Sequence, residues 1–248
     1  GKTSITAMIL HVLQNLNIDC DYMVGAQLEG FDTMVKLTHE APIIILEGDE
    51  YLSSPIDRRP KFHLYQPHIA VLSGIAWDHI NVFPSFDTYV DQFRIFKNMV
   101  TDKLIYCSLD EELNKLAKEK TKCQLIPYAT PKYSILNGIT TVENTELIIF
   151  GNHNLQNLNA ARLVCNELGV TDSNFFLKIA NFKGASMRLE LVKKTASSAI
   201  YKDFAHSPSK LKATSSAMKK QFAKRKLVAC MELHTFSSLN EEFLQEYK

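Results

Sequence analysis

The stretch GKTSITAMIL (Gly1–Leu10) opens the chain and indicates its fold. Its first three residues, Gly1, Lys2 and Thr3, match the end of the phosphate-binding pattern G-x-x-x-x-G-K-[ST]. Apolar residues then recur at the spacing of one helix face: Ile5, Met8, Ile9, Val12, Leu13 and Leu16. We therefore expect a helix that begins at Lys2 or Thr3, with free N–H groups at its start that favour an anion. A three-residue match also occurs by chance, so a plain helix start is the alternative.

Composition places the chain among ordinary folded proteins. It has 248 residues, 46% of them hydrophobic, and a net charge of +1, which gives no overall attraction to nucleic acid or to an anionic membrane. Its 5 cysteines are widely spaced and are typical of reduced thiols in the cytosol. Every apolar run is far shorter than the roughly 20 residues that span a bilayer. We expect a cytoplasmic protein of unknown oligomeric state that binds neither membrane nor nucleic acid.

Strand-like and helix-like segments alternate in the first three quarters of the chain. Apolar runs at Pro42–Leu46, His68–Ile75 and Lys103–Leu109 predict strands, and the first should be fully buried in a parallel sheet. Helical patterns cover residues 110–120, 153–169 and 172–182. Residues 133–151 predict antiparallel strands with a turn at Asn137–Gly138. This alternation indicates an α/β fold with a mostly parallel sheet.

The pattern changes after a boundary near Lys183–Gly184, so we expect one domain over residues 1–184 and another over 185–248. The second should contain strands at 188–194, 198–205 and 226–233, a basic helix after Ser207 and a last helix at 239–248. Residues 207–226 carry basic side chains and no acid. They could contact nucleic acid, but we favour a solvated helix face because Phe222 alone could stack on a base.

Polar side chains follow two of the predicted strands. Glu47 comes directly after the first, with Asp49 and Glu50 behind it, and Asp78–His79 follows the second. Ligands bind at the carboxyl ends of parallel strands, and phosphate-loop enzymes need an acid there for Mg²⁺. A neutral imidazole such as that of His79 can also bind a metal. The alternatives are a solvated acidic turn, which we weigh about equally, and a structural histidine.

Other candidate residues lie further along. Asn154 and Asn157 are three apart on one face of a helix start and can pair with an adenine edge, although asparagine also often caps helices. Arg188, near the domain boundary, suits a phosphate clamp or an ordinary ion pair. Asp203 and His206 lie at a strand end, before a proline that opens a helix.

Six segments in this order resemble the motifs of the Mur ligase family: GKTS, EGDEY, WDHI, GNHNLQN, FKGASMRLE and DFAHSP. Their order and spacing over nearly the whole chain are far more specific than any single motif. The resemblance implies a central P-loop ATPase domain at residues 1–184 that starts inside the phosphate loop. It also implies part of a Rossmann-like domain at 185–248. The chain would then be a piece of a three-domain protein and inactive on its own.

The resemblance also implies roles for the candidate residues. Gly1, Lys2 and Thr3 would bind the phosphates of ATP, and Thr3, Glu47 and His79 would hold Mg²⁺. Lys2, Glu47 and His79 would act in catalysis. Asn154 and Asn157 would contact adenine, Arg188 a phosphate, Asp203 the ribose, and His206 the phosphates or the substrate. Some relatives bridge their metals with a carbamylated lysine; here Arg94 stands at that position, and Lys97 is out of phase.

The implied reaction joins a carboxylate to an amine through an acyl phosphate. Tyr51 and the run Asp57–Phe62 resemble the members that add L-alanyl-γ-D-glutamyl-meso-diaminopimelate to UDP-N-acetylmuramate in peptidoglycan recycling. The alternatives are the biosynthetic members that add L-alanine, and a nucleotide-binding module without ligase activity.

Overall fold

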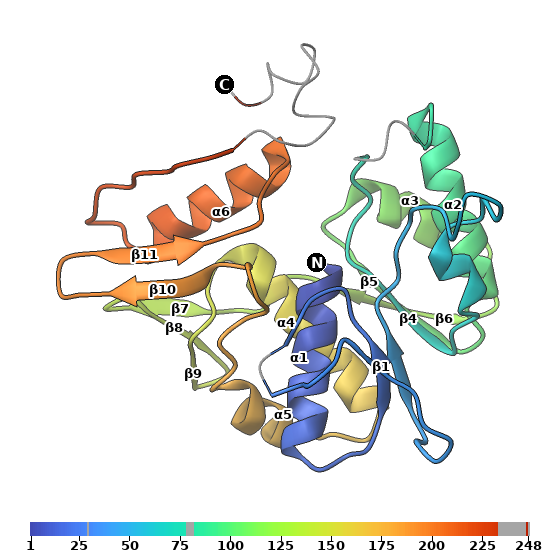
Figure 1. Cartoon of the computed structure of the whole chain (residues 1–248), viewed down its shortest axis with the longest axis horizontal. Helices are drawn as coiled ribbons and strands as arrows, with labels where there is room; N and C mark the ends of the chain where they lie inside the picture. Colours follow the sequence, from blue (N-terminus) through green and yellow to red (C-terminus); the bar gives the residue numbers. More distant parts are fainter. Residues whose placement is uncertain (29, 78–81, 233–246, 248) are drawn as a thin grey trace.

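A computed structural model describes residues 1–28, 30–77, 82–232 and 247, and it has α/β architecture (Figure 1). The predicted first helix is confirmed as α1 (Lys2–Asn15), which follows Gly1 and packs against α4 (Asn152–Glu167) and α5 (Asp172–Ile179). The Ile5 N–H donates to the Gly1 carbonyl over 3.0 Å, so helical bonding starts at the first residue.

One small sheet lies beside α1. It has the order β2-β1-β3, where β1 is Asp21–Met23, β2 is Val35–Lys36 and β3 is Ile44–Leu46. β1 and β3 are parallel, as the fold class requires. The prediction that the strand ending at Leu46 is fully buried is wrong, because Ile44 is 50% exposed. The reason is that β3 is an edge strand of this sheet.

A second sheet is wholly parallel in the order β4-β5-β6, formed by Ile69–Leu72, Lys103–Cys107 and Gln124–Tyr128. The short helix η1 (Lys61–Leu64) and α2 (Phe86–Met99) pack together, and α3 (Glu111–Lys118) contacts β5. The parallel pairing confirms the predicted α/β class. Sequence patterns found β4 and β5 but missed β1, β6 and α2.

The third sheet is antiparallel and joins β7 (Ser134–Leu136), β8 (Ile139–Val142) and β9 (Thr145–Leu147). Asn137 and Gly138 form the predicted turn between β7 and β8, with φ of 52° and 75°. Positive φ at both central residues is the geometry that Asn-Gly favours in a two-residue hairpin.

The C-terminal part pairs β10 (Glu190–Lys194) with β11 (Ala199–Lys202) in antiparallel fashion, and α6 (Pro208–Gln221) follows. The predicted strand at 226–233 is wrong over its described residues, 226–232, which are irregular and mostly exposed. A strand needs a hydrogen-bonding neighbour, and this segment pairs with no described strand. The predicted last helix, 239–248, lies outside the described residues except for Tyr247.

Two groups of buried apolar side chains hold the described chain together. The larger joins α1, the parallel strands, α4 and α5, and reaches Ala185. The smaller consists of Phe150, Leu189 and Ala217, with Tyr201, Met218 and Phe222 packed against it. The domain boundary near Lys183–Gly184 stays a prediction. Among the described helices, none combines the length and apolar character needed to cross a membrane.

Candidate functional site

The start of α1 meets the end of β3 through Thr3 and Glu47. The Thr3 hydroxyl donates to Glu47 Oε1 over 2.6 Å, and the Gly25 N–H donates to Glu47 Oε2 over 2.7 Å. The Glu47 carboxylate is buried, so these contacts replace its lost hydration. The contact between Thr3 and Glu47 places a hydroxyl and a carboxylate oxygen side by side at the first turn of a helix.

Lys2 lies against the acidic residues that follow Glu47. Its ammonium group pairs with the Glu50 carboxylate and lies 3.3 Å from Asp49 Oδ1. Burial alone would lower the pKa of Lys2, but the charges of Glu50 and Asp49 raise it above its ordinary value. Lys2 therefore stays protonated and can neutralise an anion that enters the site.

Gly1 brings the end of β4 against the start of α1. A Cβ atom built on Gly1 would lie 2.4 Å from Ser73 Oγ and 2.9 Å from Ser73 Cβ, closer than atoms can approach. It would also lie 3.5 Å from Asn157 Oδ1, on α4. A larger residue would overlap Ser73, so Gly1 allows the start of α1 to lie close to the end of β4 and to the first turns of α4.

Asn154 and Asn157 both lie in the first turns of α4 and both are buried. The Asn154 amide donates to the Phe150 carbonyl over 3.0 Å, and Asn157 faces Gly1. The structure thus places Asn157 beside the predicted phosphate loop and gives Asn154 a partner within its own segment.

Two cations from the C-terminal part lie near Gly1. The charges of Lys210 and Arg188, like that of Lys2, act on the Gly1 nitrogen, which places these side chains within electrostatic reach of it. The Arg188 guanidinium also stacks over the Phe204 ring at 4.9 Å. Three cations from distant segments therefore gather at the start of α1, which is suited to an anion of high charge.

Asp203 and His206 lie where β11 leads into α6. Asp203 accepts from the Leu189 N–H over 2.7 Å and from the Ala205 N–H over 2.8 Å. His206 Nδ1 lies 2.9 Å from the Phe204 carbonyl. Asp203 also accepts from the Thr214 hydroxyl over 3.2 Å, so the partners described for both side chains lie in their own part of the chain.

Sequence reasoning missed His153, which stands just before Asn154 on α4. Burial lowers the pKa of His153, and the nearby charge of Asp203 partly offsets the shift. The histidine is thus a largely neutral group near Asp203 of the C-terminal part. The sequence did carry a signal for this residue, because His153 directly precedes Asn154, one of the two predicted adenine contacts.

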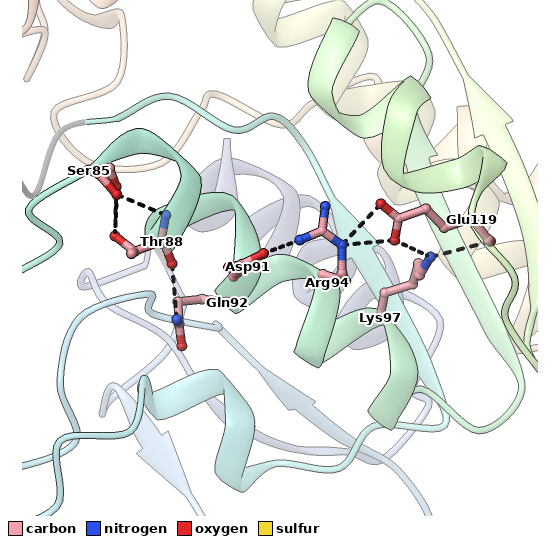
Figure 2. Close-up of polar contacts among 7 residues, drawn as sticks. All are labelled: Ser85, Thr88, Asp91, Gln92, Arg94, Lys97 and Glu119. Carbon is pink, nitrogen blue, oxygen red and sulfur yellow. Dashed lines mark hydrogen bonds and ion pairs between the residues drawn. The ribbon is translucent and has the colours of Figure 1, made fainter.

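His79 lies outside the described residues, and the residues weighed as metal bridges are engaged elsewhere. Figure 2 shows Arg94 and Lys97 of α2 pointing toward Glu119, at the end of α3. Arg94 Nε donates to Glu119 Oε2 over 2.9 Å, and Lys97 Nζ donates to the Leu116 carbonyl over 2.8 Å. Both side chains therefore connect α2 to α3 and have no contact with Glu47 among the interactions described.

The donor set at Thr3 and Glu47 fits Mg²⁺, which takes oxygen ligands. Among the described residues, no three histidine, cysteine, aspartate or glutamate side chains form a metal-binding group. Mg²⁺ in phosphate sites usually has one or two protein ligands and takes the rest from phosphates and water, so a small set suffices.

The chain is similar to known ligases over most of its length. The Mur ligase middle domain matches residues 1–165. A UDP-N-acetylmuramate–L-alanine ligase of Roseiflexus sp. is 26% identical over 276 residues, covering 96% of this chain and 56% of the relative. A UDP-N-acetylmuramate–L-alanyl-gamma-D-glutamyl-meso-2,6-diaminoheptandioate ligase of Haemophilus influenzae is 25% identical, covering 88% of this chain and 51% of the relative.

Among solved structures, a murein peptide ligase from Psychrobacter arcticus has a TM-score of 0.65 at 19% identity. The matched region covers 96% of this chain and 58% of the Psychrobacter chain. The likeness shows a shared fold. The chain spans about half the length of the curated relatives it matches. With the middle-domain match over residues 1–165, the chain belongs to the Mur ligase family.

Proposed function

We propose that this chain is part of an ATP-dependent amide ligase and carries its nucleotide-binding site. The observation that carries the proposal is the contact of Thr3 with Glu47, beside the protonated Lys2. A phosphate loop that ends at a strand carboxylate is the arrangement by which such enzymes bind Mg²⁺ and nucleotide phosphates. Family membership supports the same chemistry.

The surrounding residues suit the rest of the nucleotide. Lys2, Arg188 and Lys210 provide positive charge for the phosphates. Asn157 lies beside the loop and, with Asn154, is proposed to contact adenine. Asp203 is proposed to contact the ribose, since a carboxylate has about four acceptor positions and the contacts with two backbone N–H groups and the Thr214 hydroxyl use three. His206 is likewise proposed to contact the phosphates or the substrate, and His79 to bind the metal.

The proposed reaction has two steps. A carboxylate oxygen of UDP-N-acetylmuramate attacks the γ-phosphorus of ATP, and the bond to ADP breaks. The acceptor amine then attacks the acyl carbon of the acyl phosphate, inorganic phosphate leaves, and the nitrogen gives up a proton. Lys2 would stabilise the charge that develops on the transferred group. Mg²⁺, held by Thr3 and Glu47, would supply further charge neutralisation when bound.

We propose the tripeptide L-alanyl-γ-D-glutamyl-meso-diaminopimelate as the acceptor. Support comes from the segment that resembles the recycling members, where Lys61 lies over the Tyr51 ring at 4.7 Å and 3.9 Å from Asp49 Oδ2. A cation next to the site favours an acceptor that carries carboxylates. L-Alanine is the second candidate, because relatives that add it are similar over most of this chain.

The experiment compares the two amines in the intact protein. With ATP, Mg²⁺ and UDP-N-acetylmuramate, we expect kcat/KM for phosphate release to be about a hundredfold higher with the tripeptide than with L-alanine. Two charge-assisted contacts, at about 1.5–3 kcal/mol each, are enough for this ratio. A preference for L-alanine would place the protein with the biosynthetic members and leave the nucleotide site unaffected.

A further inference from the structure

A buried glutamine fastens α6 to the antiparallel β7–β9 sheet. Gln221, the last residue of α6, is 8% exposed. Its Nε2 donates to the Gly138 carbonyl over 2.8 Å, and its Oε1 accepts from the Thr140 hydroxyl over 3.0 Å. Thr140 is completely buried. Both ends of the amide are thus satisfied by residues of one hairpin, and withdrawal of that hairpin would leave buried polar groups unsatisfied.

The Asn137–Gly138 turn supplies one of these partners. The β7–β8 ladder closes with the pair Leu136 and Ile139, so the two turn residues lie beyond it. The Gly138 carbonyl is therefore available to a group outside the sheet, and Gln221 uses it. This contact joins the Asn137–Gly138 turn to the end of the basic helix α6, two sequence features that lie outside the phosphate loop.

Close packing extends the contact to the start of α4. A Cβ atom on Gly151, the residue before α4, would lie 2.5 Å from Ala217 Cβ of α6. Next to it the Phe150 ring meets Tyr201 at 5.4 Å and Phe222 at 5.9 Å, both edge to face. Figure 1 shows α6, β10 and β11 on the side of the molecule where β7, β8 and β9 lie.

Asp203 connects this docked helix to Arg188. Its carboxylate accepts from Thr214 Oγ1 of α6 over 3.2 Å and from the Leu189 N–H over 2.7 Å. Leu189 follows Arg188 directly, and Lys210 lies in the first turn of α6. The placement of α6 therefore sets the placement of both Arg188 and Lys210.

We propose that Gln221 is a positioning residue, which holds α6 on the β7–β9 sheet and thereby keeps Arg188 and Lys210 at the phosphate site. The inference rests on the proposed nucleotide function of Lys2, Arg188 and Lys210. Gln221 has no contact with the phosphate loop among the described interactions, so its effect on nucleotide binding passes through α6.

The test uses Gln221→Met, which keeps the length of the side chain and removes both hydrogen bonds. Ser216→Ala, at an exposed position of the same helix, is the matched control. Amide hydrogen exchange and the Kd for Mg-ATP are measured in the intact protein. We expect faster exchange over residues 189–221, unchanged exchange over α1, and a Kd raised about tenfold. The control should match the wild type.

A combined variant separates positioning from general loss of stability. If Gln221 acts through Arg188 and Lys210, adding Gln221→Met to Arg188→Ala/Lys210→Ala should leave the Kd close to that of Arg188→Ala/Lys210→Ala alone. Unchanged exchange in Gln221→Met, an unchanged Kd, or fully additive effects would each overturn the inference. Failure of the wild type to bind Mg-ATP would instead contradict the proposed function, and the exchange data would still decide whether Gln221 holds α6.

Discussion

Thr3 Oγ1 lies 2.6 Å from Glu47 Oε1, although 44 positions separate the two residues. The contact joins the first turn of α1 to the end of β3. With the Gly25 N–H on the other oxygen, it fixes the orientation of the carboxylate before any ligand binds. A site held in this way needs little rearrangement to accept a metal and a nucleotide, which favours binding.

Glu47→Gln should weaken Mg-dependent nucleotide binding. The substitution keeps the size of the side chain but removes the negative charge that would face Mg²⁺. We expect the Kd for ATP, measured by calorimetry, to rise at least tenfold with Mg²⁺ and to change little in EDTA. Glu50→Gln is the comparison, because Glu50 pairs with Lys2 and not with Thr3, so any change in its Kd for ATP should be similar with Mg²⁺ and in EDTA. Equal loss with and without Mg²⁺ would argue against Glu47 as a metal ligand.

Gly1→Ala should separate the phosphate loop from the end of β4. The new methyl group would overlap Ser73, so the free energy of unfolding should fall by about 1–3 kcal/mol. Urea unfolding measures this loss. Adding Ser73→Gly removes both overlapping atoms and should restore most of it. No rescue by the second substitution would mean that the close approach to Ser73 is not the cause.

Lys97→Met should destabilise the fold without affecting the chemistry. The Lys97 side chain is 1% exposed and its Nζ donates to the Leu116 carbonyl, which the variant leaves without this donor. We expect a loss of about 1–3 kcal/mol in thermal or urea unfolding, with ligase kcat within about threefold of the wild type. Added bicarbonate should have no effect on either protein. Lost activity in a stably folded variant would instead indicate a carbamylated Lys97 at the metal.

His153 should make stability depend on pH. Burial lowers its pKa below the ordinary 6.5, so the unfolded chain binds a proton more readily than the folded chain. The neutral His153 contributes fully to the free energy of unfolding above about pH 6.5, and this contribution decreases as the pH falls from there toward the pKa of the folded chain. When the pH is lowered from about 7.5 to 5.5, the free energy of unfolding should therefore fall less in His153→Gln than in the wild type. Identical losses in urea unfolding would contradict this prediction.

Local patterns predicted α1 and the Asn137–Gly138 turn well, because each depends on neighbours in the chain. The exposure of Ile44 could not be predicted, since it depends on which strands pair with β3. β1 was missed because its three residues include Asp21 and form no apolar run, unlike the three residues of β3. α2 was missed although Tyr89, Phe93 and Phe96 follow helical spacing, and the buried Lys97 weakened that pattern.

At the site, the sequence predicted the types of residue but not their contacts. Glu47 was found because it ends a strand, but its bond to Thr3 is a tertiary contact. Gln221 was missed for a different reason. A glutamine on a lysine-rich helix looks solvent-facing, and only the structure shows the hairpin that satisfies its amide.

The most direct test of the account is phosphate release by the intact protein with ATP and Mg²⁺. The proposed ligase should release phosphate only when UDP-N-acetylmuramate and an acceptor amine are both present, and should form one amide bond for each phosphate. Glu47→Gln should lower this rate at least a hundredfold while remaining folded by circular dichroism. Release that needs neither substrate, or amide formation that survives in Glu47→Gln, would contradict the account.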